Sequence, residues 1–180
     1  MRPVPGTRSP RIAAQRATRQ EAPSHRREKA LERSAPGGES LMCERCGAVY
    51  ERKTWRAGAR ERAGRVGGFA PTLCLACTQI EEGEFFGRVR VLGPLAPELE
   101  DAVRRRIWNV ERRARHTQPE RRTVRVDTAA RGLEILTTSQ KLAHRMAREL
   151  EKAFGGRARY TWSDREGSIV ATWTPPAART

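Results

Sequence analysis

Cys43-Glu44-Arg45-Cys46 and Cys74-Leu75-Ala76-Cys77 are the two segments around which this sequence is organised, and they contain the only four cysteines of its 180 residues. In each segment two residues separate the thiols, a spacing that lets both sulfurs of a tight turn bind one ion. Two such turns complete a tetrahedral shell of four sulfurs, which suits Zn²⁺. Gly47 follows the first pair, where such a turn often needs a positive φ. We therefore predict that Cys43, Cys46, Cys74 and Cys77 bind one zinc ion.

The residues between the two pairs predict a zinc ribbon over 41–80. The spacer from Gly47 to Leu73 has 27 residues, which exceeds the spacer of about 15–20 residues that is usual for such sites. It begins with a segment, 48–55, whose β-branched and aromatic residues favour a strand. A glycine-rich loop then leads to the second pair, so the expected order is turn, strand, loop and turn.

A thiol oxidoreductase is the enzymatic alternative for C-x-x-C pairs. Such chemistry needs one pair at the start of a helix that follows a strand, with a lowered pKa of the attacking thiol. Here we expect both pairs in turns and closed around one metal ion, and four cysteine ligands leave no open coordination position. The three histidines, His25, His116 and His144, are scattered along the chain and form no set of acid, base and nucleophile. We expect a protein that is not an enzyme.

The charge balance is the second strong feature of the sequence. The chain has 36 Lys and Arg residues against 21 Asp and Glu residues, a net charge of +15. Such a field favours polyanions, of which nucleic acid is the commonest in a cell. All but four of the basic residues are arginines, and arginine both pairs with phosphate and stacks on bases, which suits RNA.

The composition also bounds the location and the organisation of the protein. No run of 18 apolar residues is present, and the first residues, 1–6, lack the apolar core of a signal peptide. We therefore expect a cytoplasmic protein with no membrane contact. In the cytoplasm its cysteines would remain reduced. Residues 1–40 carry nine basic and four acidic residues and predict a disordered basic arm, which either follows a phosphate backbone or only increases solubility.

Basic residues that the metal would hold in place are the first candidates for nucleic-acid binding. They lie between the two cysteine pairs and comprise Arg52, Lys53, Arg56, Arg60, Arg62 and Arg65, with Trp55 among them. A tryptophan in such a position can stack on a base. The alternative, which we favour, is that the Trp55 ring packs as the small core of the ribbon.

A long amphipathic helix over 96–116 carries the second group of candidates. Its apolar residues recur at helical spacing and are Leu99, Val103, Ile107, Val110 and Ala114. The arginines proposed for RNA binding on its other faces are Arg104, Arg105, Arg112 and Arg113. Trp108 lies one turn from both Arg104 and Arg112. A basic helix face of this kind either binds RNA or is simply solvated.

The remaining pattern predicts an α+β domain over 86–174 with the order β-α-β-β-α-β-β. The expected strands are 88–92, 123–127, 133–138, 159–162 and 168–173, and the second helix starts at a cap provided by Ser139 or Thr137 and ends at Gly155. This order contains the ferredoxin-like unit, in which two helices cover one face of an antiparallel sheet. Arg125, Tyr160 and Trp162 are candidates to face RNA on the open side, or to lie in the core.

Three segments, 43–50, 73–77 and 131–139, together resemble an uncharacterised bacterial zinc-ribbon family. That family is itself similar to the N-terminal zinc region of the archaeal and eukaryotic ribosomal large-subunit export adaptor, although that region has more cysteine pairs than this chain. The resemblance covers residues 42–173. It implies that the four cysteines are zinc ligands and that the protein associates with the ribosome or its RNA.

Two functions follow as hypotheses. The first is a non-enzymatic zinc protein that binds RNA or the ribosome through its arginine-rich surfaces. The alternative is a zinc-stabilised adaptor that binds an acidic protein partner, which the same charge would attract.

Overall fold

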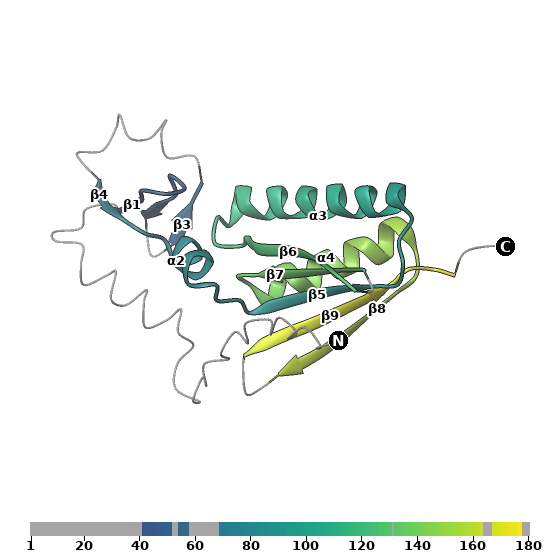
Figure 1. Ribbon diagram of the computed structural model, residues 1–180. Helices are drawn as coiled ribbons and strands as arrows, with labels where there is room; N and C mark the ends of the chain where they lie inside the picture. The colour runs from purple at the N-terminus through teal and green to yellow at the C-terminus, as the bar shows by residue number, and fades with distance from the viewer. Residues whose placement is uncertain (1–40, 52–53, 58–68, 131, 164–166, 178–180) are drawn as a thin grey trace, which may run out of the picture.

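The computed structural model describes residues 41–51, 54–57, 69–130, 132–163 and 167–177 (Figure 1). The predicted arm over 1–40 lies outside these residues. Among them the chain forms two mixed sheets and three helices. The predicted α+β class is therefore confirmed.

The first sheet and the helix after it form a small unit around the cysteines, which we call the cysteine module (41–82). Its strands are β1 (Leu41–Cys43), β2 (Val49–Glu51), β3 (Thr54–Arg56) and β4 (Ala70–Thr72), and its helix is α2 (Leu75–Glu82). The single strand expected over 48–55 is thus a hairpin of β2 and β3. The strands lie in the order β3-β2-β1-β4, with β1 and β4 parallel.

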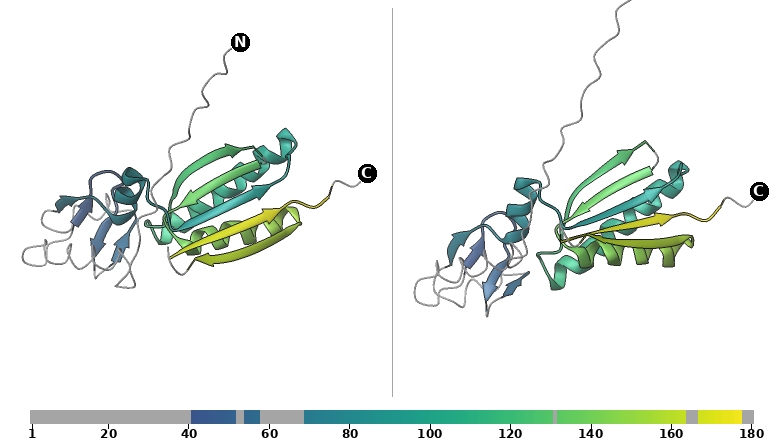
Figure 2. Two further views of the ribbon diagram at one scale, coloured as in Figure 1. Left: turned by 60° about the horizontal axis from the view of Figure 1, so that its bottom comes forward. Right: turned by 90° about the horizontal axis from the view of Figure 1, so that it is seen from below.

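The second sheet and two helices form a larger two-layer unit (87–174). Its elements are β5 (Gly87–Leu92), α3 (Pro97–Thr117), β6 (Thr123–Ala129), β7 (Gly132–Thr137), α4 (Gln140–Phe154), β8 (Arg157–Ser163) and β9 (Ser168–Thr174). The chain order predicted from the sequence, β-α-β-β-α-β-β, is the order observed. Both helices cover the same face of the sheet (Figure 2).

The helices form where the apolar spacing places them. Pro97 stands at the start of α3, where its missing N–H costs no hydrogen bond. Helix α4 ends at Gly155, whose φ of 73° lies in the left-handed region that glycine adopts without strain. The expected side-chain cap of α4 is absent: the Ser139 side chain makes no capping bond, and its carbonyl instead accepts from the N–H groups of Leu142 and Ala143.

The arrangement of the larger sheet does not confirm the ferredoxin-like prediction. The strands lie in the order β6-β7-β5-β9-β8. Strands β5, β6 and β7 keep the split β-α-β arrangement, because β7 pairs antiparallel with both of its neighbours. Strand β9, however, pairs parallel with β5 and separates it from β8. The final hairpin therefore inserts its second strand, and β8 becomes the edge.

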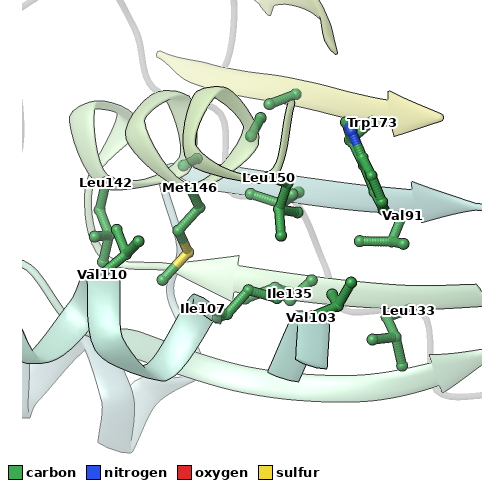
Figure 3. Close-up of a cluster of buried hydrophobic side chains, with 14 of the residues drawn as sticks. Val91, Val103, Ile107, Val110, Leu133, Ile135, Leu142, Met146, Leu150 and Trp173 are labelled. Carbon is green, nitrogen blue, oxygen red and sulfur yellow. The ribbon is translucent and has the colours of Figure 1, made fainter. Parts of the chain in front are cut away.

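The main core lies between this sheet and the two helices (Figure 3). Alternate residues of β5, β7 and β9 point into it, including Val91, Ile135 and Trp173. Leu142, Met146 and Leu150 of α4 meet them at a spacing of four residues. Because these side chains are fully buried, truncation of any one to alanine is expected to cost about 2–5 kcal/mol.

The strand register decides which face of the sheet Arg125, Tyr160 and Trp162 occupy. Tyr160 and Trp162 pair with Ala171 and Ile169, whose side chains are buried in the main core. Residues directly opposite each other share a face, so both aromatics lie on the helix side. Tyr160 stacks on His144 of α4 with ring centroids 4.5 Å apart. Of the three candidates, only Arg125 lies on the open face, and it is paired with Asp127.

In the described part of the chain, no helix combines the length and the apolar character that crossing a membrane requires.

Candidate metal centre and basic surface

The pairing of β1 with β4 brings the two cysteine pairs together. In this parallel pair Cys43 lies beside Thr72, so both strands end at the same edge of the small sheet. Cys43 is the last residue of β1, and Cys74 follows β4 by two residues. The long spacer therefore begins and ends at the same end of these two strands, and this brings the second cysteine pair next to the first.

The four sulfurs form one cluster that can hold a metal ion. The Sγ atoms of Cys43, Cys46, Cys74 and Cys77 all lie within 4.8 Å of one another, and those of Cys46 and Cys74 are 3.7 Å apart. A tetrahedral ion with bonds of about 2.3 Å to sulfur separates its ligands by about 3.8 Å, whereas a disulfide needs about 2.0 Å. All four cysteines are free, and the donor set fits a tetrahedral thiolate site.

The first pair lies in a turn, as the sequence predicts. Gly47 has a φ of 69°, and its N–H donates to the Cys43 carbonyl at 2.8 Å. A side chain at this φ would be strained. The turn thus directs the Cys43 and Cys46 sulfurs to the same side, toward the second pair.

The second pair does not lie in a turn. Cys74 is the residue before the first turn of α2, and Cys77 lies within that turn. The N-terminal end of a helix carries a partial positive charge, which stabilises thiolates. The backbone N–H of Cys74 also donates to the Cys43 sulfur at 3.3 Å. One C-x-x-C pair therefore does start a helix after a strand, but its sulfurs face the other pair.

Without a metal ion the pKa values of the thiols differ widely. A hydrogen bond from Cys74 lowers the pKa of Cys46 to about 4. The same bond raises the pKa of Cys74, and burial adds to that rise. Burial raises the pKa of Cys77 to about 11. At neutral pH the empty cluster therefore keeps protons that a metal ion would displace.

Arg122 connects this cluster to the two-layer unit. Its Nη1 lies 3.8 Å from the Cys77 sulfur. Its backbone is fixed to the end of β7, because its N–H donates to Thr138 Oγ1 at 2.9 Å and its carbonyl accepts from the Thr138 N–H. A divalent ion bound by four thiolates has a net charge of −2. The positive charge of the Arg122 guanidinium would partly neutralise it.

Trp55 is part of the core of the cysteine module. The side chain is only 2% exposed and packs with the Tyr50 ring at a centroid distance of 5.3 Å. It shares its cluster with Leu41, Ala48 and the cysteines. The candidate role of Trp55 in stacking on a base is therefore wrong for this conformation, and the core alternative is the one observed. Of the other candidates on this spacer, Arg56 is exposed at the end of β3, whereas Arg52, Lys53, Arg60, Arg62 and Arg65 lie outside the described residues.

The outer face of α3 is a basic stripe with an aromatic centre. Arg105, Trp108 and Arg112 lie one turn apart and are exposed. Trp108 is 60% exposed, and the Arg112 guanidinium lies 5.0 Å from the centre of its ring. Arg113 is also exposed. The remaining candidate, Arg104, faces the sheet instead: it pairs with Glu100 at 2.7 Å and donates to Thr128.

The carboxyl end of α3 and the end of β3 border an open surface hollow of about 570 Å³. Its lining residues are Ala57, Arg112, Arg113, Arg115 and His116. We call it the module–helix groove. Arg112 belongs both to this groove and to the stripe, so the two features are continuous.

Two features near the site were not among the candidates predicted from the sequence: the module–helix groove and the contact of Arg122 with Cys77. Arg115 continues the helical spacing of Arg105, Trp108 and Arg112, so the sequence did carry a signal for it. Nothing local places Ala57 beside His116, because 59 positions separate them along the chain.

Fold and site together define an α+β protein with a four-cysteine centre that can hold a metal ion. No protein-family model, no curated protein and no solved structure matches this chain.

Proposed function

We propose that this protein binds zinc at Cys43, Cys46, Cys74 and Cys77 and uses its arginine-rich surfaces to bind RNA, in association with the ribosome. The metal has a structural role. Four cysteine sulfurs fill a tetrahedral shell and leave no position for a substrate or for water, so we propose no enzymatic activity. Zinc instead stabilises a module whose own core is small.

The observation that carries RNA binding is the pair of Trp108 and Arg112 on α3. Burial of a tryptophan is favourable, so a ring that is 60% exposed is a candidate contact for a partner. Arg112 stacked over the ring adds a planar charge beside it. An aromatic platform bordered by arginines is the combination that binds single-stranded nucleic acid through stacking and phosphate contacts. A second, weaker support is the resemblance to the bacterial zinc-ribbon family, which is itself similar to the zinc region of the ribosomal export adaptor.

The test is purification from cells without added metal, followed by measurement of bound zinc and of copurified nucleic acid. We expect one zinc per chain and an absorbance ratio at 260 and 280 nm that falls after a high-salt wash. Anisotropy with a labelled single-stranded RNA should then give an affinity that decreases steeply with salt. Salt-insensitive or absent RNA binding by the zinc-loaded protein would sink the proposal. A protein partner that survives nuclease treatment would favour the adaptor alternative.

A further inference from the structure

We infer that the module–helix groove is a phosphate-binding site for the backbone of a single RNA strand, one of whose bases stacks on Trp108. This inference rests on the proposed RNA binding and gives it a location. It adds Arg115 and His116 to the binding residues, and it makes the cysteine module one wall of the site through Ala57.

Charge is the first support. The groove is lined by three arginines and one histidine, and among the described residues none of these four side chains is paired with a carboxylate. Some arginines elsewhere in the two-layer unit are paired, such as Arg88 with Glu134 at 2.9 Å and Arg106 with Glu149 at 2.6 Å. In the groove, by comparison, three arginines that lie close together have no carboxylate among the described residues to neutralise them.

The helix dipole does not account for these residues. The carboxyl end of a helix carries about −0.5 of a charge, which one cation more than compensates. Three guanidinium groups stand at the end of α3. The excess therefore favours an external anion, and guanidinium groups bind phosphate oxygens in a bidentate manner.

Continuity favours a polymeric ligand. The groove has a volume of about 570 Å³, which is more than one phosphate fills. Arg112 connects the groove to the Trp108 ring. A strand that places its phosphates in the groove can therefore place a neighbouring base on that ring. Such stacking needs an unpaired base, which favours single-stranded RNA over a duplex.

His116 provides a local reporter. The chain has three histidines: His116 lines the groove, whereas His144 stacks on Tyr160 of β8. In NMR spectra of the zinc-loaded full chain, with ring signals assigned from His116→Gln and His144→Gln variants, a short single-stranded RNA should shift the His116 ring signals. It should leave those of His144 in place. Shifts of both rings, or of the His144 ring alone, would contradict the inferred site.

Matched charge variants complete the test. The variant Arg113→Gln with Arg115→Gln removes two groove charges, and Arg145→Gln with Arg148→Gln removes two exposed charges of α4. If two phosphates are lost from the contact, the slope of log affinity against log salt should fall by about 1.4 in the groove variant, at about 0.7 per phosphate. The α4 variant should keep the original slope.

Each further outcome has a distinct meaning. Equal loss in both variants would overturn the groove as a site while leaving RNA binding intact. A wild-type protein that binds no RNA would refute the proposed function itself. Equal affinity for a DNA strand of the same sequence would keep the groove as a binding site but contradict the preference for RNA. Binding of an acidic protein by the groove arginines, in place of RNA, would overturn the inference.

Discussion

The Arg122 guanidinium lies 3.8 Å from the Cys77 sulfur and so joins the loop after α3 to the four-cysteine cluster. The contact unites two units that have separate sheets and separate buried cores.

The variant Arg122→Ala tests this contact. Mutation of a group that hydrogen-bonds to a metal ligand typically lowers metal affinity by about 10- to 100-fold. We expect the variant to lose zinc affinity by a factor in that range, measured by competition with a chromophoric chelator. The backbone bonds of Arg122 to Thr138 remain in the variant. The neighbouring Arg121→Ala is the control, and Arg122→Lys should recover part of the affinity. An unchanged affinity would show that the contact is incidental.

Removal of the metal should unfold the cysteine module alone. Its buried cluster contains few side chains besides the cysteines themselves, and so small a core rarely folds without a metal ion. The two-layer unit has its own core of sixteen buried residues. After treatment with a chelator and a reductant, hydrogen exchange followed by mass spectrometry should lose protection in 41–51 and 69–82. Protection in 87–177 should persist. Loss of protection across both units would contradict this independence.

Zinc binding should release protons and weaken as the pH falls. Cys74 and Cys77 both have a raised pKa in the empty cluster, so their thiols are protonated at neutral pH and must lose those protons to bind a metal ion. Cys46, with a lowered pKa near 4, contributes none. Calorimetry in buffers of different ionisation enthalpy should therefore show a buffer-dependent heat. The Cys77→Ser variant is the control, since it should release fewer protons, and a heat independent of buffer would contradict the expectation.

The two most exposed tryptophans give a matched comparison of the RNA surface. Trp108 and Trp162 are 60% and 57% exposed, on α3 and β8 respectively. Loss of base stacking costs about 1–3 kcal/mol, or roughly 5- to 150-fold in affinity. We expect Trp108→Ala to weaken RNA binding within that range in an anisotropy assay. Trp162→Ala should have little effect, and the reverse order would move the contact to the edge of the sheet.

What the sequence could predict follows from how local the signal is. The spacing of Val103, Ile107 and Val110 defines α3 because a helix repeats every 3.6 residues. The four cysteines of the candidate centre were likewise visible from their pairwise spacing alone. The start of α2 just after Cys74 was not, because so short a helix has little apolar periodicity from which to predict it.

The sequence did not predict how segments far apart in the chain are arranged in space. The hairpin of β8 and β9 was predicted, but which of its strands pairs with β5 is a long-range arrangement that no local pattern encodes. The face of Tyr160 and Trp162 stayed open for the same reason, since alternation identifies two faces without saying which is buried. The module–helix groove is the extreme case, because Ala57 and His116 meet only in the folded chain.

The insertion of β9 between β5 and β8 has a consequence for biosynthesis. The strand that fills the interior of the larger sheet is the last one of that unit to leave the ribosome, and its partner β5 precedes it by about eighty residues. Chains fold vectorially as they emerge. The cysteine module is complete much earlier, so it can bind a metal ion while the larger sheet still lacks the strand between β5 and β8. Maturation of this protein is therefore expected to proceed in two stages, with metal capture first and closure of the main core last.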